Sequence, residues 1–124
     1  MQTHTELVCE QLNTLIDLLV NTTRTLVVDD ANAVEPGCRD GLDALYAAVQ
    51  YLVTYWDDVE LQILRGEGPD AEFLYAPIDG ILDLSTPLLE KSESSLSAGQ
   101  SQLLHSIFSI SRDSREIVAE LFGK

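Results

Sequence analysis

Carboxylates, serines and two histidines are the side chains of this sequence that could do chemistry. Asp79 and Asp83 lie four residues apart, on one face of a helix, but two carboxylates without a third ligand make a weak cation site. A di-iron site in a helical bundle needs a Glu three residues before a His, and neither His4 nor His105 has one. The serines have no positioned base, and the sequence contains no glycine-rich phosphate loop, nucleophile elbow or paired-cysteine zinc motif. We therefore predict no catalytic residue, no metal and no cofactor, and a protein that is not an enzyme.

One short motif indicates a different chemistry. Residues 104–107, Leu-His-Ser-Ile, resemble the start of the phosphoacceptor motif of histidine-phosphotransfer domains, which are helical bundles of this size. The resemblance implies that His105 accepts a phosphoryl group, and the heptad frame places His105 on the outside of its helix. The family pattern continues with Lys and Gly, where this chain has Phe108 and Ser109. The alternative, which we favour, is a surface histidine on a serine-rich helix face.

Acidic residues are concentrated in one part of the chain. The sequence has 21 Asp and Glu against 7 Lys and Arg, a net charge of −14, and residues 57–83 carry eight carboxylates against Arg65 alone. Direct binding to nucleic acid or to an anionic membrane is excluded, because phosphate binding needs clustered Lys and Arg. Crowded like charges oppose folding, so this stretch serves either solubility or the docking of a basic partner. The carboxylates that we predict to contact such a partner are Asp57, Asp58, Glu60, Glu67, Asp70 and Glu72.

An uncharged stretch, residues 44–56, precedes these carboxylates. Its outward positions hold Ala44, Ala47, Tyr51 and Tyr55, where a solvated helix normally carries charged residues. Interfaces are enriched in tyrosine, which combines a large apolar area with a polar tip. We predict that Tyr51 and Tyr55 lie on a contact surface. The alternative is that the third helix of the same chain buries both rings.

Apolar residues recur at helical spacing in the first half of the chain. A stripe over residues 8–27 predicts an amphipathic helix that ends near Val28, with an acidic loop after it. A second stripe over residues 38–63 steps by four and three residues, as in a coiled coil, and includes Trp56. Trp56 should therefore be buried, and Gly66 should end this second helix in a left-handed conformation.

The second half of the chain predicts two more helical segments. Asp70 can cap a short turn, after which Pro77 fits the first position of a third helix, and Pro87 should break or kink that helix. Ser97 opens a capping box for the last helix. Four helical segments joined by short loops predict an all-α, antiparallel bundle that forms a single domain over residues 1–124.

The cysteines and the first residues indicate the compartment. Cys9 and Cys38 fall on the apolar stripes, where reduced thiols behave as small buried hydrophobes, so neither a disulfide nor a metal pair is predicted. Glu6 and Glu10 stand where a secretory signal would have a basic region, and the uncharged runs are too short or too polar to span a bilayer. We predict a cytoplasmic protein without a membrane segment.

Size and charge favour a binding protein. Our leading hypothesis is a non-enzymatic acidic protein that captures and inhibits a basic partner protein, such as a nucleic-acid-binding protein or a toxin. Three classes are similar in size and charge: anti-CRISPR proteins and other small inhibitors of bacterial defence nucleases, DNA mimics, and immunity proteins that cap basic toxins. The alternative is a self-associating structural or adaptor bundle, a homodimer whose seam uses the uncharged middle of the second helix. Phosphotransfer through His105 is a remote third hypothesis.

Overall fold

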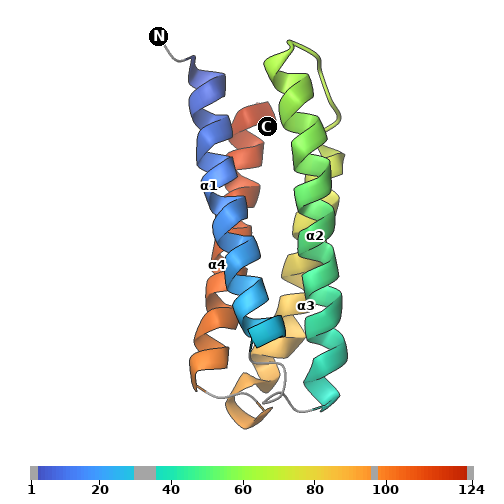
Figure 1. Cartoon of the computed structure of the whole chain (residues 1–124), viewed down its shortest axis with the longest axis vertical. Helices are drawn as coiled ribbons and strands as arrows, with labels where there is room; N and C mark the ends of the chain where they lie inside the picture. The colour runs from blue at the N-terminus through green and yellow to red at the C-terminus, as the bar shows by residue number, and fades with distance from the viewer. Residues whose placement is uncertain (1–2, 30–35, 96–97, 123–124) are drawn as a thin grey trace.

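In a computed structural model that describes residues 3–29, 36–95 and 98–122, this chain forms four α-helices, and those residues contain no strand. The elements are α1 (His4–Arg24), the π-helical turn η1 (Thr25–Asp29), α2 (Pro36–Leu64), α3 (Glu72–Ser95) and α4 (Ala98–Phe122). Successive helices run in opposite directions along the long axis of the molecule (Figure 1). The predicted all-α, antiparallel four-helix bundle is therefore confirmed.

The helices form a ring in which each packs against the next along the chain, and α4 closes the ring against α1 (Figure 1). The contact between α1 and α2 is the least extensive of the four. The second predicted stripe supplies much of the core, because its members from Leu42 to Val59 are buried. Trp56 belongs to this stripe and is only 2% exposed, which confirms the prediction of its burial.

The ends of the first two helices also follow the sequence signals. η1 continues α1 to Asp29, close to the predicted end at Val28. Gly66 has a φ of +80°, the left-handed conformation expected of the residue that ends α2. The Gly66 N–H donates to the carbonyl of Ile63 at 3.0 Å, and the Glu67 N–H donates to the carbonyl of Gln62 at 2.8 Å. These two hydrogen bonds form a Schellman motif, which satisfies the last carbonyls of α2.

The start of α3 differs from the sequence prediction. The Glu72 N–H donates to Oδ1 of Asp70 at 3.0 Å, so the helix begins at Glu72 and Pro77 lies in its second turn. The prediction that Pro77 opens the helix is wrong, because Asp70 caps the same helix one turn earlier. Pro87 also lies inside α3, which continues to Ser95 without a break. A bend of the helix axis at Pro87 stays a prediction.

Three predictions fall on parts of the chain that the structure does not describe. They concern the acidic loop over residues 30–35, the side chain of Cys38 and the capping residue Ser97. Cys9, in contrast, is buried and has a free thiol, as predicted. Within the described ranges, no helix has both the length and the hydrophobicity that are needed to cross a membrane.

Candidate protein-interaction site

Three aromatic side chains lie together on the outer side of α2 and α3. The rings of Tyr51 and Tyr55 are stacked with their centroids 6.4 Å apart, and the centroid of Tyr55 lies 5.8 Å from that of Phe73 on α3. Tyr51 is 61% exposed, Tyr55 is 38% exposed and Phe73 is 54% exposed. We call these three residues the aromatic patch. Both tyrosines therefore lie at the surface, and the alternative that α3 buries them is wrong.

The side chains of α3 explain why the tyrosines remain exposed. A shallow groove of about 450 Å³ lies between the two helices beside the aromatic patch. The α3 side of the groove is formed by Ala76, Pro77 and Gly80, which are too small to cover a tyrosine ring. A Cβ atom added at Gly80 would meet no atom within 4 Å. The groove is thus open because of small residues on α3, and its walls are mainly apolar.

A third tyrosine, on another face of α3, holds an arginine of α4. Tyr75 is 8% exposed, and the guanidinium carbon of Arg115 lies 4.9 Å from the centroid of its ring. Nε of Arg115 also donates to Oδ1 of Asp79 at 2.7 Å. This hydrogen bond, together with the negative charge of Asp79, raises the pKa of Arg115. We call Tyr75, Asp79 and Arg115 the arginine clamp.

The arginine clamp changes the interpretation of Asp79. The sequence offered Asp79 and Asp83 as a weak candidate site for a divalent cation. In the structure, the carboxylate of Asp79 is already paired with Arg115. In the parts of the chain that the structure describes, no group of three His, Cys, Asp or Glu side chains could hold a metal ion.

The six predicted carboxylates point in different directions. Asp58 follows Tyr55 by three residues and Tyr51 by seven, so it lies on the same face of α2 as the two tyrosines. Successive residues lie about 100° apart around a helix axis. Asp57 follows Tyr55 by two residues, so it lies on the side of α2 away from Tyr55. Glu60 faces α1, where its Oε2 accepts a hydrogen bond from Nδ2 of Asn13.

The other three carboxylates lie at the turn between α2 and α3 and in the first turn of α3. Glu67 and Asp70 are exposed in that turn, where Asp70 caps α3. Glu72 precedes Tyr75 by three residues and Asp79 by seven, so it lies on the face of α3 that carries the arginine clamp. Of the six carboxylates, Asp58 is therefore the one that shares a helix face with the aromatic patch.

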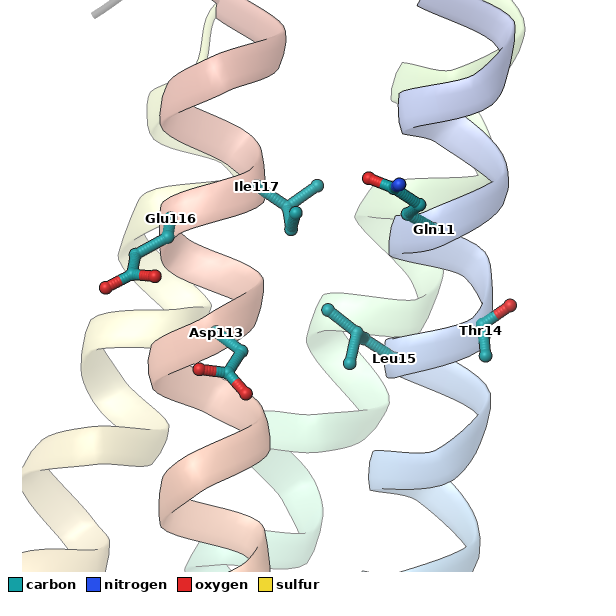
Figure 2. Close-up of a pocket in the computed structure, with 6 residues that line it drawn as sticks. All are labelled: Gln11, Thr14, Leu15, Asp113, Glu116 and Ile117. Atoms are coloured by element: carbon teal, nitrogen blue, oxygen red, sulfur yellow. The ribbon is translucent and has the colours of Figure 1, made fainter.

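A second groove, of about 500 Å³, lies between α1 and α4, on the opposite edge of the ring of helices. Figure 2 shows Leu15 of α1 and Ile117 of α4 pointing toward each other across it. Asp113 and Glu116 lie along its α4 side, and Gln11 and Thr14 along its α1 side. No pattern in the sequence predicted this groove, because its two sides come from opposite ends of the chain. It contains no aromatic side chain, so it offers less contact area to a partner.

An adjoining part of the same seam contains His105. The side chain is exposed, as the heptad frame predicted, and it lies in a shallow groove with Leu18, Thr22, Ser106 and Ser109. The groove is also lined by Ile110 and by the carboxylate of Asp113, and its lining offers no lysine or arginine that could hold a phosphoryl group, which suits a surface histidine.

No protein-family model matches this chain, and comparisons with the curated proteins and with the solved structures give no significant match.

Proposed function

We propose that this protein binds a basic partner protein through the aromatic patch and Asp58, and that it inhibits this partner by covering a cationic surface. The observation that carries the proposal is the contact between three exposed aromatic rings on a chain with a net charge of −14. Contiguous exposed apolar groups on a soluble domain mark interaction sites, and tyrosine is enriched among the residues that contribute most to binding. The negative charge then favours a basic partner.

The remaining carboxylates support the same proposal in a different way. Asp57, Glu60, Glu67, Asp70 and Glu72 lie outside the face of α2 that carries the two tyrosines, but their charges add to the negative field around that end of the bundle. Such a field accelerates encounter with a basic protein and weakens with salt. We therefore assign contact to Tyr51, Tyr55, Phe73 and Asp58, and electrostatic steering to the other five carboxylates.

We propose that the protein acts in the cytoplasm and inhibits its partner in the way that anti-CRISPR proteins, DNA mimics or immunity proteins do. An acidic protein can occupy the surface that a basic nuclease or toxin uses for nucleic acid, since that surface must itself carry clustered Lys and Arg. Covering it requires no catalytic residue on the acidic protein.

The test is capture of a partner from the native host by the wild-type protein and by the Tyr51→Ser/Tyr55→Ser variant. We expect a basic protein with the wild type and its loss with the variant. Leu18→Ser is the matched control, because Leu18 is 50% exposed on α1, away from the patch. Recovery of the same partner by all three proteins would contradict the proposed surface, and recovery of no basic protein by the wild type would contradict the function.

Self-association through the same face of α2 is the second candidate. Ala44, Ala47 and Tyr51 are exposed and uncharged, so two copies could meet there without bringing carboxylates together. Sedimentation at low and high salt separates the two proposals. A dimer that persists in high salt and dissociates in the Tyr51→Ser variant would favour the structural role, whereas capture of a basic partner should weaken steeply with salt.

A further inference from the structure

The arginine clamp and the aromatic patch contain the same kinds of side chain on two different helices. We infer that Tyr51, Tyr55 and Asp58 form a binding site for an arginine side chain of the basic partner. This inference rests on the proposed function and specifies what the patch recognises. The template for this site is the arginine clamp, where the chain binds one of its own arginines through both a tyrosine ring and a carboxylate.

The arginine clamp shows the geometry that such a site needs. Tyr75 and Asp79 lie four residues apart on α3, so they share one face of the helix. The guanidinium of Arg115 lies over the ring of Tyr75 and donates to the carboxylate of Asp79. A tyrosine with a carboxylate one turn later on the same helix therefore binds a guanidinium by a cation–π contact and a charged hydrogen bond.

A related pair lies on α2, where the carboxylate follows the tyrosine by three residues instead of the four that separate Asp79 from Tyr75. Asp58 comes one turn after Tyr55, on the same helix face. Residues three apart on a helix are neighbours on its surface, so a guanidinium over the ring of Tyr55 would lie within reach of the carboxylate of Asp58. Asp58 is exposed and has no ion-pair partner among the described residues. Both elements of the clamp are thus accessible to an arginine from outside.

The groove beside the rings offers space for the aliphatic part of an arginine side chain. This aliphatic part would lie across Ala76 and Pro77, which form the apolar wall opposite the tyrosines. Tyr51 extends the ring surface by one further turn, with its centroid 6.4 Å from that of Tyr55. Arginine fits this site better than lysine, because the planar guanidinium stacks on a ring while donating to a carboxylate in its own plane.

The test uses two probes, a short arginine-rich peptide and the same peptide with every arginine replaced by lysine. Titration of the folded protein is followed by the NMR signals of the tyrosine rings. We expect the arginine peptide to bind about two- to fivefold more tightly, the range of an exposed cation–π contact. Asp58→Asn and Tyr55→Leu should each remove this preference and weaken binding.

Asp57→Asn is the matched control, since it removes the same charge from the other side of α2 and should leave the preference for arginine intact. Equal affinity for the two peptides would overturn the arginine site. If the Tyr51→Ser/Tyr55→Ser variant then bound neither peptide, that result would still support the proposed function. A preference for arginine that survives Asp58→Asn and Tyr55→Leu would place the arginine elsewhere. If neither peptide binds while the host partner is still captured, the inference fails and the proposed function stands.

Discussion

The indole nitrogen of Trp56 donates a hydrogen bond to Oδ1 of Asn13, which joins α2 to α1. The other end of the Asn13 amide donates to Glu60, so the three polar groups form a chain across the least extensive of the four helix contacts. Trp56 is buried, and a buried indole N–H without an acceptor would cost free energy. Asn13 therefore lets a large aromatic ring occupy the core beside α1.

Replacing Asn13 should destabilise the bundle through Trp56. We expect Asn13→Ala to lower the free energy of unfolding by about 1 to 3 kcal/mol, because the indole N–H loses its acceptor. Trp56→Ala should cost about 3 to 5 kcal/mol, since it also leaves a cavity. Urea denaturation measures both changes. In a Trp56→Phe background, the Asn13→Ala substitution should lower the free energy of unfolding by clearly less. An equal loss in both backgrounds would show that the hydrogen bond from Trp56 does not contribute to stability.

The sequence was sufficient for features that depend on local periodicity. The regular spacing of apolar residues identified the second helix and the burial of Trp56, and Gly66 marked the end of that helix because few other residues tolerate a positive φ. The same periodicity could also have separated Asp57 from Asp58, since adjacent residues on a helix point about 100° apart. A sum of charge along the chain cannot separate the two carboxylates, because it ignores their positions around the helix axis.

Features that depend on pairs of helices could not be predicted in the same way. Whether α3 covers Tyr55 depends on which of its residues lie opposite, and these proved to be small ones such as Ala76 and Gly80. The arginine clamp joins Asp79 to Arg115, 36 residues later, and no spacing within one helix indicates such a contact. Pro77 was misplaced because two local signals, a cap and a proline, competed for one helix start.

The Schellman motif at the end of α2 gives a second prediction. Gly66→Ala should lower the free energy of unfolding by about 1 kcal/mol, because alanine is strained at a φ of +80°. Gly68→Ala is the matched control in the same turn, since Gly68 does not have a positive φ and a Cβ atom there would meet nothing within 4 Å. Thermal unfolding of the two variants should separate them. Equal stability would mean that the turn relaxes to accept alanine at Gly66.

Cys9 should be an unreactive thiol. Burial raises its pKa above the ordinary value, and the charges of Glu60 and Glu6 raise it further. Since the thiolate is the reactive form, a raised pKa moves the rate of alkylation to higher pH. In a Cys38→Ser background, Cys9 should therefore react with iodoacetamide much more slowly than a free thiol at pH values near its ordinary pKa.

Removing the charge of Glu60 tests this cause. Glu60→Gln should shift the pH profile of Cys9 alkylation toward lower pH, because one source of repulsion against the thiolate is lost. Glutamine keeps an oxygen that can accept the hydrogen bond from Asn13. Glu10→Gln is the control, since Glu10 lines the same groove as Cys9 but does not contribute to its raised pKa. Identical profiles for the two variants would show that the charge of Glu60 does not raise the pKa of Cys9.

Ser111 is an unusual core residue, because its hydroxyl is buried without a hydrogen-bond partner among the described residues. Other buried hydroxyls of the bundle donate to the carbonyl one turn earlier, as Ser114 does to Ile110 at 2.8 Å and Ser85 to Ile81 at 2.7 Å. An unpaired hydroxyl in an apolar core opposes folding, whereas a paired one is close to neutral. Ser111 should therefore reduce the stability of the native bundle.

Ser111→Ala should accordingly stabilise the protein. We expect the free energy of unfolding to rise by about 1 kcal/mol, because the substitution removes the unpaired hydroxyl and introduces a better helix former. For a domain of this size the melting temperature should rise by about 4 °C, which calorimetry measures directly. Ser114→Ala is the matched control on the same helix and should give no such gain, since its hydroxyl is already paired. A loss of stability in Ser111→Ala would show that the hydroxyl of Ser111 makes a hydrogen bond in solution, for which a buried water is the simplest partner.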